Sequence, residues 1–573
     1  MYRISNLLAR IYQIRLRPLL LLVMLVSMSA CSGSDNAFTD ATQTCYNVTL
    51  AYPGTTTTKN LCTTRENGGF NGLGVSRFLR FSLASPSSVS IQVTRTNGID
   101  PADPDIYIYK NGVSFGSAES ASHNSESLNV SLEAADYVVE IREFWYVIAA
   151  NKSQSLTARS LPTGVNITAL PAAASVSSLA ACTPGNDLIV SGTASFDRVP
   201  HNGVSLDYNN IIQLPVQQAV VSVICNGQVY STSVTNEMGQ YSLSFPSGQQ
   251  SFVRVRAQMM KTGIPAWDFS VVDNTVATQP AYVMDSEPFT STTSLSLNPH
   301  ATSGWGGTAY IDAKRVAAPF AILDSVRKAK EKILFVAPDS IFPPLLLNWS
   351  KLNTTVAGDI RLGQIETSFF DGEQIFLLGA EDNDTDEYDE HVIIHEWGHY
   401  FEHNFSRSDS IGGPHTSGDV LDVRVAFGEG FGNAFSSMVT DNRFYIDVSG
   451  IEQTEGFLID MEANNCVKPG WFSECSVQSI LYDLYDTRNE FGVDNLSLGF
   501  TPIYNVMVGE HKNTPALTSI FSFIKPLKDQ SIANQIDVTV QSQSIDPVLD
   551  VYGDSQISND PGETTQLPLY MAF

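Results

Sequence analysis

The sequence predicts a multidomain protein in which two N-terminal β-sandwich modules precede an α+β domain. The chain has 573 residues, more than the roughly 250–300 residues at which single hydrophobic cores stop growing. Between residues 45 and 285, apolar residues alternate with polar ones over strand-length segments. Helical spacing of apolar residues begins only after residue 300, so we place the start of the α+β domain there.

The first 30 residues have the pattern of an export signal. Four arginines between positions 3 and 17 precede an apolar segment, Leu19 to Val26, that is too short to span a bilayer. The residues Met28-Ser29-Ala30-Cys31 resemble a bacterial lipobox, which implies that Cys31 is lipidated and anchors the protein to a membrane. We therefore expect an exported protein of the bacterial cell envelope, at the outer membrane, with residues 31–44 as a tether. The alternative is an ordinary cleaved signal peptide in which Cys31 has no role.

The composition is strongly acidic. The chain carries 60 acidic and 33 basic residues, which gives a formal net charge of −27 at pH 7. A surface with this charge repels phosphate backbones, so we expect no nucleic-acid partner. The sequence leaves the oligomeric state open.

The seven cysteines favour an exported protein with disulfide bonds. Six remain without Cys31, and they form three pairs that are local in the sequence: Cys45 with Cys62, Cys182 with Cys225, and Cys466 with Cys475. Because an even number of cysteines in an exported chain favours disulfides, we predict these three pairs. Buried free thiols are the alternative.

The first β module is expected at residues 45–165. Its strand segments are residues 78–83, 89–93, 106–109, 128–132 and 137–141. The run from Asp103 to Tyr109 and the later Ala135-Asp136-Tyr137 resemble the pre-peptidase C-terminal type of β-sandwich, which implies an accessory module of a secreted peptidase. A generic β-sandwich explains the same segments equally well. Residues 166–181 are expected to be a linker.

The second β module is expected at residues 182–285. Its strand segments are residues 188–192, 219–225, 228–230, 239–243 and 252–256. The segment Thr235 to Tyr241 resembles the carboxypeptidase regulatory-like sandwich, where such a turn leads into a strand. Neither β module contains a catalytic set of residues, so we expect both to serve presentation or binding.

The α+β domain is expected at residues 300–527, with a helix over 316–335 and a strand over 374–379. The next apolar segment, residues 391–400, contains His395-Glu396-Trp397-Gly398-His399. Two histidines four residues apart lie on one face of a helix, where both imidazoles can bind a single zinc ion. Glu396 is offset from that face and can act as the general base toward a water at the zinc. The alternative is a surface helix that matches this short pattern by chance.

The third zinc ligand follows from a second motif. Gly428-Glu429-Gly430 resembles the second zinc helix of the gluzincins, the thermolysin and fungalysin type of metallopeptidase. That resemblance implies a zincin-like metallopeptidase domain in which Glu429 is the third ligand. Asn433 stands where those families often have an aspartate that braces a zinc histidine, and its amide oxygen can accept the same imidazole N–H. Phe405 stands where metzincins have their third histidine, and His403 is a rival ligand.

Further residues are candidates for supporting roles. His415, in a glycine-rich loop between the two motifs, could donate a hydrogen bond to the oxyanion, as could Tyr482 or Tyr485 on a helix over 477–485. A structural loop histidine and a core aromatic residue are the alternatives. The acidic run from Glu381 to Glu390 could hold calcium, although a solvated loop that ends in a helix N-cap is the preferred interpretation. We assign no role to the tail at residues 528–573.

Together these patterns predict a zinc-dependent peptidase with peptide or protein substrates. Glu396 would take a proton from water during attack on a peptide carbonyl and pass it to the leaving amine. One alternative is a surface-anchored binding protein whose zinc site is structural or inactive. Another is a zinc hydrolase of non-peptide amides.

Overall fold

The chain divides into two compact units, Met1–Ala41 and Thr42–Phe573. The computed structural model describes residues 42–65, 70–98, 102–120, 124–143, 182, 185–463, 465–488, 496–528, 532–557 and 568–573, all in the second unit. The expected signal peptide, Cys31, most of the expected tether and the linker at 166–181 lie outside these residues. Within the described ranges, no helix is long and apolar enough to cross a membrane.

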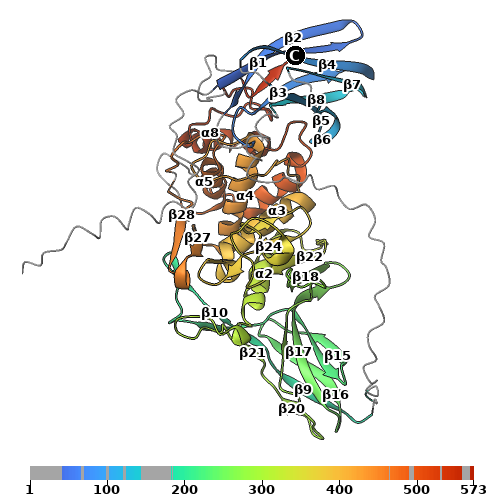
Figure 1. Cartoon of the computed structure of the whole chain (residues 1–573), viewed down its shortest axis with the longest axis vertical. Coiled ribbons are helices and arrows are strands. Elements are labelled where there is room, and N and C mark those ends of the chain that lie inside the picture. Colours follow the sequence, from blue (N-terminus) through green and yellow to red (C-terminus); the bar gives the residue numbers. More distant parts are fainter. Residues whose placement is uncertain are drawn as a thin grey trace, which may run out of the picture. The chain divides into compact units, whose positions relative to one another are not determined.

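The first β region forms a sandwich of two antiparallel sheets, to which one parallel strand is added (Figure 1). One sheet has the order β2-β1-β4-β7, from β1 (Thr42–Tyr52), β2 (Thr55–Arg65), β4 (Ser87–Gly98) and β7 (Ser125–Leu132). The other has the order β29-β3-β8-β5-β6, from β3 (Ser76–Leu83), β5 (Pro104–Lys110), β6 (Val113–Ala118), β8 (Ala135–Glu143) and β29 (Tyr570–Ala572). Apolar residues at every second position of these strands meet in one core between the sheets.

The five strand segments predicted in this region are confirmed, but the extent of the module differs from the expected 45–165. The sandwich begins at Thr42, and its last strand comes from the expected C-terminal tail, where β29 pairs in parallel with β3. The backbone groups at the edge of β3 need partners, and the apolar chain end supplies them. The tail also contains α8 (Ala533–Ser542), which packs against α5 and α7, so α8 and β29 make this tail a part of the fold within its described residues.

The second β region consists mostly of short strands. These are β9 (Asp187–Thr193), β10 (Ser195–Arg198), β11 (His201–Asn202), β12 (Ser205–Leu206), β13 (Ile212–Pro215), β14 (Ala219–Cys225), β15 (Gln228–Val234), β16 (Gln240–Pro246), β17 (Ser251–Lys261), β18 (Trp267–Val272), β19 (Val283–Asp285), β20 (Leu295–Ser296) and β21 (His300–Ala301). They form the small sheets β16-β9-β20, β13-β10-β21 and β11-β12, and part of an eight-stranded sheet.

The eight-stranded sheet crosses the boundary expected near residue 300. Its order is β15-β14-β17-β18-β22-β24-β23, with β19 paired to β17. The strands from beyond the boundary are β22 (Leu345–Trp349), β23 (Phe369–Phe370) and β24 (Ile375–Leu377). Because β22 pairs in parallel with β18, the second β region and the helical region share one sheet and one core. The expected separate sandwich at 182–285 is therefore not an independent unit.

The helices of this region pack against one another, and the first two described ones also pack against this sheet. They are α2 (Ala318–Val336), α3 (Glu390–Asn404), α4 (Val423–Thr440), α5 (Glu474–Tyr485), α6 (Phe500–Val506), α7 (Ile520–Leu527) and α8. A small sheet, β25-β26-β27-β28, lies beside them, from β25 (Gly379–Ala380), β26 (Asp384–Thr385), β27 (Phe444–Ser449) and β28 (Glu455–Asp460). Figure 1 shows α3, α4 and α5 grouped together, with α3 carrying the histidine motif and α4 carrying Glu429.

The three predicted disulfides are confirmed: Cys45–Cys62, Cys182–Cys225 and Cys466–Cys475. The first joins the paired strands β1 and β2. The helices predicted over 316–335 and 477–485 are confirmed as α2 and α5. The strand predicted over 374–379 is β24, which lies inside the sheet between β22 and β23, so the edge position belongs to β23.

Candidate metal centre

Three predicted ligands converge where α3 meets α4. His395 Nε2 lies 3.0 Å from His399 Nε2 and 3.2 Å from Glu429 Oε2, and His399 Nε2 lies 3.5 Å from the same oxygen. Ligand atoms bound to one tetrahedral zinc at about 2.0–2.2 Å stand about 3.3 Å apart, so this spacing fits a zinc ion. His395, His399 and Glu429 also form one of the two sets of described residues that could hold a metal.

Two glycines let the helices approach closely enough to bring these ligands together. A Cβ built on Gly398 of α3 would lie 3.3 Å from the Cα of Gly432 on α4. A Cβ on Gly432 would lie 2.8 Å from ring atoms of His395. A side chain at position 432 would therefore displace the imidazole, and this glycine leaves the ring its place.

Each histidine has its second ring nitrogen bound by a protein acceptor. His395 Nδ1 donates to Asn433 Oδ1 at 2.8 Å, and Asn433 Nδ2 donates in turn to Gln478 Oε1 at 2.8 Å. His399 Nδ1 donates to Glu402 Oε2 at 3.2 Å, and Glu402 is completely buried. Both bonds leave Nε2 free to face a metal, and such partners orient metal-binding imidazoles. The sequence indicated Asn433, whereas Glu402 was missed, although it lies three residues after His399 on the same helix.

The side chain of Glu396 is buried beside the ligands, near the backbone N–H of Phe370. Burial raises the pKa of Glu396, while the nearby His395 and His399 oppose that rise. Phe370 belongs to β23, the last strand of the eight-stranded sheet. A buried carboxylate with a raised pKa next to a metal site has the properties of a general base.

The structure brings His415 to this cluster. Its Nε2 lies 3.4 Å from Glu429 Oε2 and 3.4 Å from Glu474 Oε2, while its Nδ1 donates to the Gly413 carbonyl at 3.1 Å. Glu474, in the first turn of α5, is a further site residue that the sequence did not reveal, because an acidic residue there looks like an ordinary helix start. Burial raises the pKa of Glu474 to about 6, although His415 opposes the rise.

Tyr482 and His403 lie away from the cluster. After burial itself, the charged groups that shift the pKa of Tyr482 are Asp486, Glu462, Asp441 and Arg443, none of which belongs to the site. Tyr482 lies two helical turns beyond Glu474, so the structure does not support the oxyanion role expected for it. His403 is exposed, with its ring 5.9 Å from the ring of Phe370, and it is not among the converging ligands.

A second set of possible metal ligands lies just before α3. Carboxylate oxygens of Asp384, Asp386 and Asp447 lie within 4.8 Å of one another. Asp386 is buried and accepts a hydrogen bond from the Ser368 hydroxyl, and Asp389 is completely buried. The solvated loop that the sequence favoured is therefore confirmed only at Asp382 and Asn383, which are exposed, whereas Asp386 and Asp389, the N-cap of α3, are buried. Carboxylate oxygens are the ligands that calcium prefers.

One protein family matches part of the chain. The Mycolysin C-terminal domain matches residues 348–535, about a third of the 573 residues, and this range contains both α3 and α4. This domain is associated with metallopeptidases, so the match suggests a metallopeptidase-related protein. No curated protein matches the chain.

Two solved structures show only weak similarity. One is a 1.5-MDa bacterial ice-binding adhesin, with 10% identity and a TM-score of 0.10 over 44% of this chain and 87% of the other. The second is a Ca2+-stabilized adhesin with which an Antarctic bacterium binds ice, with 10% identity and a TM-score of 0.10 over 47% and 67%. At these TM-scores neither similarity bears on fold or function.

Proposed function

We propose that this protein is a zinc-dependent peptidase. The observation that carries the proposal is the convergence of His395, His399 and Glu429, with the buried carboxylate of Glu396 beside them. The match to the Mycolysin C-terminal domain over the same region supports it. A purely structural zinc site would need no carboxylate next to its ligands, so Glu396 favours a catalytic site over a binding protein.

The protein's own residues supply proton transfer and orientation. Zinc, when held by His395, His399 and Glu429, would polarise a carbonyl and make water a stronger nucleophile. Glu396 takes a proton from the attacking water and later gives it to the leaving amine of the peptide. His415, which faces the same cluster, donates a hydrogen bond to the oxyanion that develops on the carbonyl.

The proposed location is the bacterial cell envelope, with a lipid anchor on Cys31. The lipobox-like residues 28–31 motivate the anchor, and three disulfides agree with an oxidising, exported compartment. The substrates would be peptides or proteins. Calcium at Asp384, Asp386 and Asp447 stays a prediction.

Glu396→Gln tests the proposed function, with His403→Gln as the matched control on the same helix. The amide keeps the shape of the side chain but is a far poorer base, so turnover of a peptide library should fall by ~10²–10⁴-fold. Zinc content, measured by mass spectrometry of the metal, should stay at the wild-type level in both variants, and His403→Gln should keep its activity.

Two outcomes would contradict the proposal. Wild-type turnover by Glu396→Gln would remove the proposed base. Cleavage of non-peptide amides without any cleavage of peptides would move the protein into the class of amide hydrolases. Removal of zinc with a chelator should abolish wild-type cleavage, and added zinc should restore it.

A further inference from the structure

The segment between α3 and α4 carries His415, and the first β-sandwich binds this segment on both sides of that histidine. Before it, Asn71 Nδ2 donates to the carbonyl of Pro414 at 3.1 Å. After it, the backbone N–H of Asp422 donates to the carbonyl of Asn71 at 2.8 Å. Asn71 is 1% exposed, so both bonds are shielded from water. One residue of the sandwich thus holds two points of the segment, one on each side of His415.

Neighbouring contacts extend this attachment. The backbone N–H of Leu73 donates to the carbonyl of Val420 at 3.0 Å. Gly413 has a φ of +106°, and a Cβ there would lie 2.8 Å from the ring of Phe70. The glycine therefore permits both the turn before His415 and the close approach of the sandwich.

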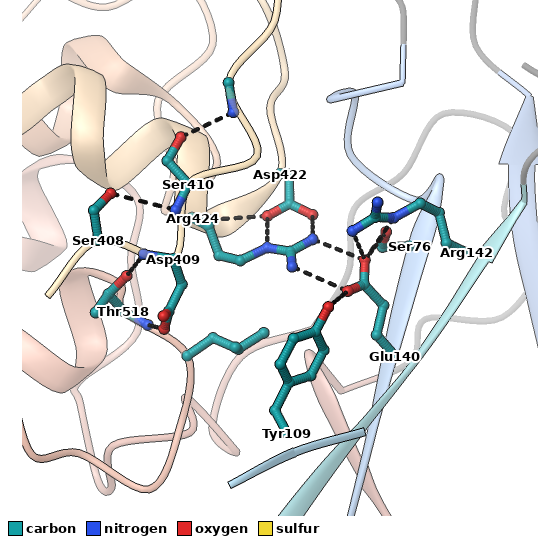
Figure 2. Close-up of polar contacts among 12 residues, drawn as sticks. Ser76, Tyr109, Glu140, Arg142, Ser408, Asp409, Ser410, Asp422, Arg424 and Thr518 are labelled. Carbon is teal, nitrogen blue, oxygen red and sulfur yellow. Dashed lines mark hydrogen bonds and ion pairs between the residues drawn. The ribbon is translucent and has the colours of Figure 1, made fainter. Parts of the chain in front are cut away.

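A buried ion pair fixes the sandwich to the start of α4 (Figure 2). Arg424 donates to both carboxylate oxygens of Glu140 on β8, at 3.0 and 2.9 Å. Tyr109, Ser76 and Arg142 also donate to Glu140, which is completely buried. Burial opposes ionisation, but Arg424 and Arg142 hold the pKa of Glu140 well below its usual range. The sandwich therefore offers a charged, oriented acceptor at the position where α4 begins.

The same arginine binds the residue that caps α4. Arg424 Nε donates to Asp422 Oδ1 at 2.8 Å, and Asp422 accepts the backbone N–H of Arg424 at 3.0 Å. Asp422 is also the residue whose backbone binds Asn71. The attachment to the sandwich is therefore continuous with the helix that carries Glu429.

We propose that the first β-sandwich holds His415 in place at the candidate metal centre and that Asn71 is the positioning residue. This inference rests on the proposed function, because it gives the sandwich a role in placing a residue of that site. The sandwich is then a part of the working peptidase and not an attached module.

Hydrogen exchange tests the positioning without relying on activity. Asn71→Ala removes the bond to Pro414 but leaves the backbone bonds, whereas Asn60→Ala removes a similar side-chain bond, to the Tyr46 carbonyl, on another part of the sandwich. Loss of one buried hydrogen bond changes an opening equilibrium by about tenfold. We expect the backbone amide hydrogens of residues 411–421 to exchange about tenfold faster in Asn71→Ala than in the wild type. In Asn60→Ala they should exchange at the wild-type rate. Unchanged exchange in Asn71→Ala would overturn the proposal, even in an inactive protein.

Kinetics test whether Asn71 acts through His415. Asn71→Ala should lower kcat by up to about tenfold with KM and zinc content unchanged, because the segment that places the donor is closed for a smaller fraction of the time. In the His415→Ala background, Asn71→Ala should have no further effect on kcat. An equal fall in kcat in both backgrounds would overturn the proposal and leave the peptidase activity itself established.

Gly413→Ala provides a second variant in case Asn71→Ala unfolds the sandwich. Its added methyl group meets Phe70 and is strained at a positive φ, so it should loosen the same segment while Asn71 is intact. Faster exchange at 411–421 together with a lower kcat supports the proposal. Wild-type exchange and kcat in Gly413→Ala contradict it.

Discussion

The two candidate zinc histidines differ in what orients them. His395 donates to the neutral amide of Asn433, which is itself bound by Gln478, whereas His399 donates to the buried carboxylate of Glu402. A carboxylate makes the imidazole a stronger ligand than an amide does, because it stabilises positive charge on the ring. We therefore expect the His399 side of the site to contribute more of the zinc affinity than the His395 side.

Glu402→Ala tests this view, with His403→Ala as the adjacent control. Removal of Glu402 leaves Nδ1 of His399 without its acceptor. Loss of such a partner typically lowers metal affinity by about 10–100-fold, so we expect a fall of this size. His403 is exposed and lies outside the cluster, so His403→Ala should keep wild-type affinity. Competition with a chelator of known affinity measures both variants. Equal affinities would show that Glu402 does not orient a zinc ligand.

At the level of elements, the crossing of α3 and α4 determines the site. The helices meet at Gly398 and Gly432, and stacked rings of Trp397, Phe401 and Phe435 fill the interface beside the glycines. The close approach is what brings Glu429 of one helix to the histidines of the other. A larger separation would leave the carboxylate out of reach of a metal held by α3.

Two glycines of α4 should therefore respond oppositely to alanine. In Gly432→Ala the new methyl group collides with the His395 ring, and such overpacking typically costs about 1–3 kcal/mol. In Gly428→Ala the nearest atom is 3.6 Å away, an ordinary contact, and alanine gains about 1 kcal/mol in helix propensity. Thermal unfolding without metal should show a lower midpoint for the first and an equal or higher midpoint for the second.

The zinc affinities of the same two variants test whether the close approach of α3 and α4 defines the site. Gly432→Ala should bind zinc more weakly although all three ligands are present, because the imidazole of His395 is displaced. Gly428→Ala should bind zinc as the wild type does. If Gly432→Ala keeps both stability and zinc affinity, the close approach of the helices does not define the site.

For the whole molecule, the last described strand, β29, joins the first sandwich to the helical region. Tyr570 of β29 is 3% exposed, and its ring centroid lies 5.4 Å from that of Phe78 on β3 and 5.3 Å from that of Tyr552. Its hydroxyl accepts the backbone N–H of Leu517 at 3.2 Å, next to α7. One tyrosine thus connects the sandwich with the helical region.

Tyr570→Ala should destabilise the protein strongly. Truncation of a buried aromatic side chain typically costs about 3–5 kcal/mol, so the thermal unfolding midpoint should fall clearly. Ala572→Ser, at an exposed position of the same strand, should leave the midpoint within error. Sandwich and helical region should lose stability together, and an unchanged midpoint in Tyr570→Ala would show that the chain end is not part of the core.

Local patterns in the sequence predicted elements better than their assembly. Alternation predicted the strands of the first sandwich, and the His395–His399 spacing predicted the helix and the converging imidazoles, because these signals depend on neighbouring residues. The pairing of β18 with β22 and of β29 with β3 depends on strands far apart in the chain, which alternation does not specify. Glu474 reaches the site for the same reason, since only the packing of α5 on α4 places it beside His415.

Anomalous diffraction at the zinc absorption edge, on crystals grown with zinc, tests the central claim most directly. The account predicts one strong peak about 2.0–2.2 Å from His395 Nε2, His399 Nε2 and a carboxylate oxygen of Glu429. It also predicts that His403 and Tyr482 do not contact the ion. A strong zinc peak only at the Asp384, Asp386 and Asp447 carboxylates, or an ion at the histidines without Glu429, would contradict the account.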